Sequence, residues 1–237
     1  MSDDVDGNAA FWKSDTEVAG WIAGSGEREQ RRRAQRRLMA DLLPFSEGEP
    51  FVFVDLGAGT GAAARAVLER HPAATALLAD YSPPMAEAGA HALEPFRGRY
   101  RYVEFDLGGG PWPDAIPECV DAVVSSMCLH HLPDARKAQL CAEVLTRLVP
   151  GGWFLDYDVV ASDDPGVEAA WDRADRRDPE AGLQHPHHAR EGRHHAEALY
   201  ISPLTSLLGF LRSAGFEAID VFWKQLDTVL VGGRRPE

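Results

Sequence analysis

Between residues 51 and 160, short apolar segments alternate with segments that favour helix, and this rhythm constrains the fold most strongly. The first segment, residues 51–55, is apolar and β-branched, as expected of a strand buried on both faces. Strands are predicted at 51–55, 75–80, 100–105, 121–126 and from Trp153, and helices at 62–70, 84–94 and 133–148. Such alternation predicts a doubly wound α/β fold, in which helices cover both faces of a parallel sheet.

The end of the chain follows a different pattern. A helix is predicted at about 202–214, where Gly215 can cap it, and strands are predicted at 218–223 and 228–231. The short connection between these strands favours an antiparallel pair. The whole pattern therefore predicts a Rossmann-like, mostly parallel sheet of seven strands that closes with an antiparallel pair.

Two stretches lie outside this alternation. Residues 1–49 are predicted to form an arm and a capping helix, with Ala34, Leu38 and Leu42 along one face of the helix at 27–43. This helix also carries six arginines between residues 28 and 37, which a nucleic acid could contact. The formal net charge of −13 favours a solvated helix face instead. Residues 161–200, polar and rich in histidine, are predicted to form an insertion into a main domain at 50–237.

A glycine-rich segment, residues 55–61 (DLGAGTG), lies between the first strand and its helix. Glycines at this place let a ligand approach the backbone closely. The spacing of Gly57, Gly59 and Ala62 also fits a dinucleotide site, so a nicotinamide dehydrogenase is one alternative, and a turn that merely packs helix on strand is another. Asp55 argues against a pyrophosphate and suits a cofactor that bears an ammonium and a sulfonium.

Two further acids follow the next strands. Asp80 ends the second strand and Asp106 the third. The carboxyl ends of successive parallel strands line one crevice, where Asp80 could bind ribose hydroxyls and Asp106 an adenine amino group. Each acid could instead cap a helix or lie on the surface. Together with Asp55 they make three acids in register, which favours a nucleoside ligand over coincidence.

Taken in order, five segments resemble the motifs of class I S-adenosylmethionine-dependent methyltransferases. They are residues 55–61, Leu77–Met85, Phe105–Leu107, Asp121–Leu132 and Leu148–Asp158. The likeness covers about 50–160 and resumes from 203 to 232. It implies S-adenosylmethionine as the cofactor and a methyltransferase domain at 50–237.

The resemblance also implies a role for individual residues. The cofactor would contact Asp55, Gly57, Ala58, Gly59 and Gly61 around its methionine portion, Asp80 at the ribose, Asp106 and Leu107 at the adenine, and Tyr81, Met85 and Ser125 nearby. Tyr81 and Met85 are equally plausible as ordinary packing residues.

The methyl acceptor is predicted to be a small molecule. After the fourth strand, methyltransferases of nucleic-acid amino groups carry an Asn/Asp-Pro-Pro-aromatic signature, whereas this chain has Ser125-Ser-Met-Cys-Leu-His-His-Leu132. His131, and after it His130, could act as a base, since an imidazole titrates near neutral pH. Either could instead cap the next helix or bind a core carbonyl.

The arm and the insertion are predicted to close the acceptor pocket, through Trp12 and Trp21 and through His187 and His188. A metal site among the histidines of 185–195 is disfavoured, because Gly192 interrupts the spacing that a helix would need.

Other functions stay open. They are a tRNA or protein methyltransferase, and a cofactor-binding partner subunit without activity. The acidic charge disfavours nucleic acid and membrane partners. Three cysteines without a C-x-x-C pair predict reduced thiols, and a polar, acidic start predicts a soluble, cytoplasmic protein. Methyl transfer to a small molecule would suit a role in secondary metabolism.

Overall fold

Seven strands form one sheet in the order β3-β2-β1-β4-β5-β7-β6 in the computed structural model, which describes residues 10–177 and 200–237. The strands are β1 (Val52–Leu56), β2 (Thr75–Asp80), β3 (Tyr100–Glu104), β4 (Val120–Ser126), β5 (Leu148–Val159), β6 (Glu217–Gln225) and β7 (Thr228–Arg234). Strands β1 to β5 pair in parallel, and β7 runs antiparallel to both β5 and β6. The predicted doubly wound fold and its antiparallel closing pair are confirmed.

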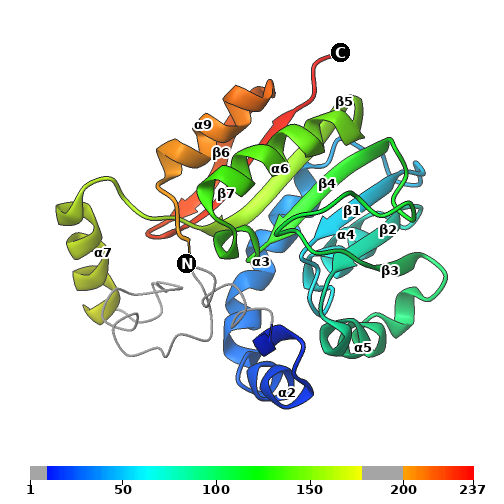
Figure 1. Cartoon of the computed structure of the whole chain (residues 1–237), viewed down its shortest axis with the longest axis horizontal. Coiled ribbons are helices and arrows are strands. Elements are labelled where there is room, and N and C mark those ends of the chain that lie inside the picture. Colours follow the sequence, from blue (N-terminus) through cyan, green and yellow to red (C-terminus); the bar gives the residue numbers. More distant parts are fainter. Residues whose placement is uncertain (1–9, 178–199) are drawn as a thin grey trace.

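Helices cover both faces of the sheet (Figure 1). The α-helices are α2 (Asp15–Ala23), α3 (Gly26–Leu42), α4 (Ala62–Arg70), α5 (Pro83–Ala92), α6 (Asp134–Arg147), α7 (Pro165–Arg177) and α9 (Leu204–Ala214). Short 3₁₀ turns, η1 (Glu94–Phe96) and η2 (Leu129–His131), add to them. Helices α3 and α4 pack against each other, as do α6 and α9, and α2 packs beside α5.

The alternation of side chains along the strands builds two cores. Phe53 of β1 packs with Met39 of α3 and Val67 of α4 in one cluster. Val54, the next residue of β1, packs with Leu140 of α6 in the other cluster. Successive side chains of a strand point to opposite faces, so a strand buried on both faces must be apolar throughout. This is why the central strands read as continuous apolar runs.

Helix α3 lies where the sequence predicts it, but its buried face is different. The buried residues are Arg32, Arg36, Met39, Ala40 and Leu43, whereas Ala34 is exposed and Leu38 and Leu42 are partly buried. The prediction that the arginines form a solvated face is therefore wrong for Arg32 and Arg36. They lie on the helical stripe that continues toward Met39 and Leu43, and that stripe faces the sheet.

The structure differs from the sequence prediction at two further places. Strand β5 begins at Leu148 rather than at Trp153, because the chain continues through Gly151, at φ 77°, with an irregularity in its pairing with β4. Helix α7 occupies part of the segment that was predicted to be irregular, and it lies away from the sheet in Figure 1. Across residues 10–177 and 200–237, no helix is both long and apolar enough to span a membrane.

Candidate functional site

A cavity of about 600 Å³ lies at the carboxyl ends of the parallel strands. Its wall includes segments at the carboxyl ends of four strands: Gly57–Thr60 at β1, Asp80–Ser82 at β2, Phe105–Gly109 at β3 and Ser126–Cys128 at β4. The order of strands reverses between β1 and β4, and open α/β sheets bind ligands at such a reversal. The volume is in the range of small-molecule and cofactor sites.

The glycine segment forms the floor of this cavity. Gly57 and Gly59 have φ values of 64° and 52°, a left-handed conformation that glycine adopts without strain. A Cβ atom at Gly57 would lie 1.9 Å from Sγ of Cys128, so no larger residue fits there. The amide of Gly57 donates to the carbonyl of Ala79 at 2.8 Å, which ties the loop to the end of β2.

Asp80 lines the cavity and also organises the loop. One carboxylate oxygen accepts from the amide of Gly59 at 2.7 Å, and the other accepts from the amide of Ser82 at 2.8 Å. Burial raises the pKa of Asp80, although these amide hydrogen bonds act against the shift. The carboxylate therefore holds two segments of the wall in register, whatever ligand it also binds.

Asp55 lies behind the loop and outside the wall of the cavity. One carboxylate oxygen accepts from the amide of Ala64 in the first turn of α4 at 2.9 Å, and the other has no hydrogen-bond partner among the described residues. Burial raises the pKa of Asp55 to about 7, against the hydrogen bond from Ala64 and the charge of Arg36. Asp55 thus caps α4 and places a titratable group beneath the glycine segment.

Gly61 and Ser125 also lie outside the wall, for reasons of packing. An added Cβ at Gly61 would meet Leu93 at 2.6 Å, so this glycine allows α4 to pack closely. Ser125 is fully buried and donates to the carbonyl of Leu56 at 3.0 Å. Because successive side chains of β4 face opposite ways, its neighbour Ser126 reaches the cavity instead.

The other residues predicted to contact the cofactor come together in the wall: Ala58, Tyr81, Met85, Asp106 and Leu107. Asp106 accepts from the amide of Gly108 at 2.8 Å, which shapes the turn after β3. Burial and the neighbouring charge of Asp80 raise the pKa of the Tyr81 phenol. Met85 and Leu107 are buried and provide the apolar part of the same region.

The N-terminal arm contributes aromatic rings to the cavity. Trp12 and Trp21 both line it, with their rings edge to face at 5.5 Å. The ring of Trp12 also meets that of His131 edge to face at 5.9 Å. The Ser82 hydroxyl donates to the carbonyl of Trp12, which attaches the arm to the segment after β2. The predicted residues His187 and His188 lie outside the described residues.

His130 and His131, from η2, both line the cavity. Nδ1 of His130 lies 2.5 Å from a carboxylate oxygen of Asp158 on β5, and the amide of His130 donates to the other oxygen at 2.9 Å. Burial alone would raise the pKa of Asp158, but the charge and hydrogen bonds of His130 hold it below its usual range. Asp158 is therefore an ionised acceptor that fixes the proton of His130 on Nδ1.

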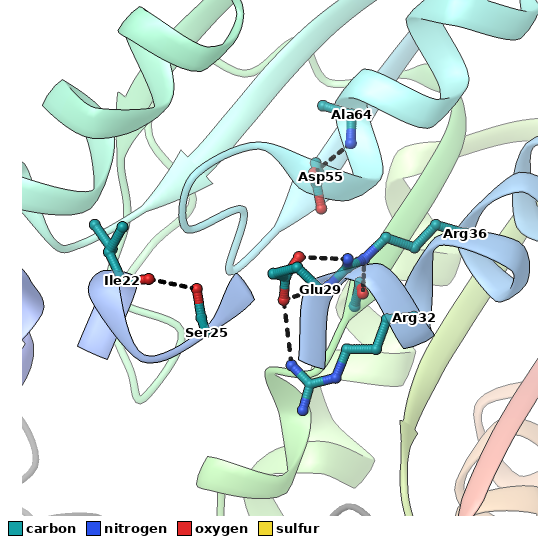
Figure 2. A network of polar contacts seen from close by, with 8 residues as sticks. Ile22, Ser25, Glu29, Arg32, Arg36, Asp55 and Ala64 are labelled. Atoms are coloured by element: carbon teal, nitrogen blue, oxygen red, sulfur yellow. Dashed lines mark hydrogen bonds and ion pairs between the residues drawn. The ribbon is translucent and has the colours of Figure 1, made fainter. Parts of the chain in front are cut away.

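Several wall residues were not predicted from the sequence. Glu29, Arg32 and Arg36 of α3 form an ion-pair network inside the cavity (Figure 2). Their spacing on the buried stripe that leads to Met39 was the signal that could have revealed them. Met127 has a left-handed φ of 58°, which is uncommon for a residue with a side chain and is frequent near functional sites.

The chemistry of this wall fits a nucleoside cofactor with a positively charged centre. Carboxylates stand at the ends of β2 and β3, where hydroxyl and amino groups can donate to them. The glycine floor offers close backbone approach beneath the same space. A pyrophosphate would face the carboxylates of Asp80 and Asp106, so the dinucleotide alternative fits less well.

Comparisons with known proteins agree with this geometry. Residues 53–152 match the family model described as a methyltransferase domain. An uncharacterized methyltransferase of Geobacillus kaustophilus is 30% identical over 126 residues, which cover 53% of this chain and 55% of that protein. A demethylmenaquinone methyltransferase of Thermus thermophilus is 33% identical over 117 residues, which cover 49% of this chain and 50% of that protein. The chain thus spans about half the length of these relatives.

Solved structures share the fold. One is human N-acetylserotonin methyltransferase in complex with SAM, which is 18% identical with a TM-score of 0.66. The match covers 96% of this chain and 58% of the human chain. The order of strands and the antiparallel β6–β7 pair are those of the methyltransferase fold. Residues 53–152, which contain the glycine segment and the strand-end acids, are therefore similar to a methyltransferase domain, and the chain shares the fold of these enzymes.

Proposed function

We propose that this protein transfers a methyl group from S-adenosylmethionine to a small molecule whose nucleophilic atom is activated by loss of a proton, such as an aromatic hydroxyl. The carrying observation is the buried His130–Asp158 pair in the same wall as the glycine segment and Asp80. When bound, the cofactor supplies an electrophilic methyl group on its sulfonium. The residues of the chain must then hold the cofactor, align the acceptor and remove a proton.

The glycine segment and the adjacent wall would hold the cofactor. Gly57 and Gly59 would lie beneath its methionine portion, Asp80 would accept from the ribose hydroxyls, and Asp106 with Leu107 would border the adenine. Asp55 would act from behind the loop as a positioning residue. These roles agree with the positions of the side chains along the ends of β1, β2 and β3.

Removing the proton is assigned to His130. Because Asp158 accepts from Nδ1, the neutral imidazole carries its lone pair on Nε2, and Asp158 stabilises the imidazolium that forms when Nε2 takes a proton. The acceptor hydroxyl would lose its proton to Nε2 as its oxygen becomes a nucleophile. His131 would instead help Trp12 to shape the acceptor side, since their rings are in contact.

Alignment and exclusion of water are assigned to the arm. Trp12 and Trp21 line the cavity beyond the segments that the strands provide. Positioning two reactants can lower a barrier by about 7–11 kcal/mol, so an arm that orders the acceptor has a large effect available to it. The insertion at 161–200 would complete this side, since Tyr200 at its end lines the cavity and its amide donates to the carbonyl of His130 at 2.7 Å.

The names of two similar proteins suggest further acceptors to test. One is a demethylmenaquinone methyltransferase, and a solved O-methyltransferase family 2 protein from Planctomyces limnophilus is in complex with apigenin. A base beside the acceptor would suit transfer to a phenolic oxygen, and it would suit transfer to a carbon activated by a neighbouring phenolate.

The test combines cofactor binding with turnover. Calorimetric titration should show saturable binding of S-adenosylhomocysteine and none of NAD. Transfer of a labelled methyl group to a panel of hydroxylated aromatic compounds should fall about 10²–10⁴-fold in His130→Gln, with S-adenosylhomocysteine affinity within a few-fold of the parent. The rate of methyl transfer should also fall in Asp158→Asn.

The choice of acceptor distinguishes a role of His130 as a base from a purely structural role. In His130→Gln, methylation of acceptors that are already ionised at neutral pH should fall much less than methylation of acceptors that must still lose a proton. An equal loss for both classes would remove His130 from the role of base. Binding of NAD in place of the sulfur compounds would overturn the proposed function, and binding of the cofactor with no turnover would favour a partner subunit without activity.

A further inference from the structure

The ammonium group of Lys137 is buried between the start of α6 and the residues that precede α9. Lys137 is 2% exposed, and its Nζ donates to the carbonyl of Tyr200 and to the hydroxyl of Ser202. A carboxylate oxygen of Asp134, one turn earlier on α6, accepts from the same nitrogen at 3.3 Å and from the Ser202 hydroxyl at 2.6 Å. A buried cation thus joins the start of α6 to residues 200–202.

A buried lysine is a costly way to hold a fold together. Removing an ammonium group from water costs several kcal/mol, and lysine is seldom fully buried unless it is paired. The carbonyl and the hydroxyl that accept from Lys137 are uncharged. The carboxylate belongs to Asp134, whose side chain is 55% exposed, and water weakens such an ion pair. The position of Lys137 is therefore explained better by what it holds than by its contribution to stability.

Tyr200 is held through both of its main-chain polar groups. Its carbonyl accepts from Lys137, and its amide donates to the carbonyl of His130 at 2.7 Å. Tyr200 also lines the cavity, as His130 does. Because its backbone is fixed on both sides, the place of Tyr200 in the wall depends on Lys137 as well as on η2.

This part of the wall lies away from the acids assigned to the nucleoside. Those acids lie at the carboxyl ends of β2 and β3, whereas η2 follows β4, and β1 separates β4 from β2 in the sheet. His130 is the residue assigned to take a proton from the acceptor, so Tyr200, which is bonded to it, lies beside the acceptor. The rings of Trp12 and His131, which are in contact, line the same cavity. An aromatic acceptor would therefore meet aromatic side chains here.

Lys137 also faces the carboxyl groups behind His130. Asp156 and Asp158 are two positions apart on β5, so their side chains point to the same face of the sheet. Lys137 and Asp156 line one small cavity of about 10 Å³. Burial and the charge of Asp158 raise the pKa of Asp156, and the charge of Lys137 opposes this shift. Lys137 thus lies beside the acids that support His130 and holds the residue that is bonded to His130.

We propose that Tyr200 contacts the methyl acceptor and contributes to its selection, and that Lys137 is the positioning residue that holds Tyr200 beside His130. The acceptor class is a planar aromatic compound with a hydroxyl group, whose ring packs against the side chain of Tyr200 while the hydroxyl lies toward His130. The inference rests on the proposed function for the word acceptor, whereas the link from Lys137 to Tyr200 does not.

The probe is 2,3-dihydroxynaphthalene, titrated by calorimetry into the full chain saturated with S-adenosylhomocysteine. Tyr200→Ala should weaken binding of the probe about tenfold, and Tyr200→Phe should keep it within about twofold, because the ring supplies the contact. Lys137→Met should weaken it as much as Tyr200→Ala does, with S-adenosylhomocysteine affinity within about twofold of the parent. Lys224→Met is the matched control, since the Lys224 ammonium also donates to a carbonyl, that of Leu226, but lies outside the wall of the cavity.

The double variant decides whether Lys137 acts through Tyr200. If it does, Lys137→Met combined with Tyr200→Ala should bind the probe no more weakly than Tyr200→Ala alone, because changes that act through one group are not additive. Hydrogen exchange of the Tyr200 amide should be faster in Lys137→Met, whereas exchange of the Gly59 amide, which Asp80 holds, should be unchanged. Ser202→Ala, which keeps the ammonium group but removes one of its acceptors, should give the same effects in weaker form.

A purely structural role of Lys137 predicts less folded protein, with unchanged affinity for the probe in the folded fraction. That result, additive effects in the double variant, or no binding of the probe to the parent would overturn the proposal. A parent that binds no S-adenosylhomocysteine contradicts the proposed function separately, and titration of the free chain with the probe then decides on Tyr200 and Lys137. Binding of the probe as expected, with no methyl transfer to any acceptor, likewise contradicts the proposed function alone.

Discussion

Asp55 places a titratable group in the interior, directly beneath the glycine segment. Its pKa is raised from 3.8 to about 7, mainly by burial. Between these two values the folded chain retains a proton on Asp55 that the unfolded chain has released. The folded state therefore binds more protons, and the contribution of Asp55 to stability falls as the pH rises through this window.

Asp55→Asn should remove this dependence. Relative to the parent, the free energy of unfolding of the variant should increase between about pH 4 and pH 7, by up to about 4 kcal/mol. Urea unfolding of both proteins at a series of pH values measures the difference, and Asp114→Asn, at an exposed position, is the control. A difference that stays constant with pH would show that Asp55 is ionised in the folded chain at all these values.

Individual residues of the site were predictable where the sequence gives them a fixed place on the sheet. Asp80 and Asp106 follow strands that the sequence shows clearly, and both line the cavity. Arg32 and Arg36 were missed because a charged residue was expected to face solvent. The partner that lets them stay inside, Glu29, becomes apparent only when the buried stripe of α3 is known. Asp158 was missed because its partner His130 lies 28 positions earlier in the chain.

Among the elements, helix α5 is connected to the glycine segment through a side chain of β3. Gly89, in the middle of α5, lies so close to β3 that an added Cβ would be 1.7 Å from the hydroxyl of Tyr102. That hydroxyl donates to the carbonyl of Gly59 at 2.9 Å. The helix, the strand and the loop are therefore held in register through one phenol, although Gly89 is outside the wall of the cavity.

Gly89→Ala should weaken the protein even though alanine favours helix by about 1 kcal/mol. Overpacking should lower the free energy of unfolding by about 1–3 kcal/mol, and loss of the Tyr102–Gly59 bond should lower S-adenosylhomocysteine affinity several-fold. Gly209→Ala is the matched control, since nothing lies within 4 Å of a Cβ at that position of α9. If both changes have the same effect on stability and affinity, Tyr102 does not transmit the packing of α5 to the loop.

The elements themselves were predicted well where burial on both faces leaves a clear pattern. All seven strands and the helices α3, α4, α5, α6 and α9 are confirmed, with shifts of a few residues at their ends. The start of β5 was misplaced because Pro150 and the two glycines after it usually end a strand, yet here the strand passes through them. Helix α7 was missed because it lies in a polar segment and none of its residues is buried, so no contact with the core distinguishes it.

The distribution of charge over the whole molecule bears on its partners. The formal net charge is −13, and two of the arginines in the basic run of α3 are buried in ion pairs with Glu29. Two arginines of that run are therefore not available to a partner at the surface, whereas Arg31, Arg33 and Arg37 are exposed. Nucleic-acid affinity grows with the number of phosphates that cations neutralise.

Gel-shift measurements with tRNA and duplex DNA at low salt should therefore show no tight binding. The charge of the molecule repels the phosphate backbone, and the cavity presents Asp80 and Asp106 at its wall. Arg31→Gln and Arg33→Gln together should leave the result unchanged. Tight binding that weakens steeply with salt, and that these substitutions reduce, would favour an RNA acceptor over a small molecule.

The meeting of Ala161 with Ser202 and Pro203 divides the chain into two parts with different freedom to change. The amide of Ala161 donates to the carbonyl of Ser202 at 3.0 Å, so the residues that flank the segment 162–201 meet at one point near the end of β5. The entropic cost of closing a loop grows only slowly with its length, so this junction could close a segment of a different length at little cost. Proteins with the same sheet could therefore differ in the segment between positions 161 and 202. Exchange of this segment at those two positions would be a practical way to engineer the protein.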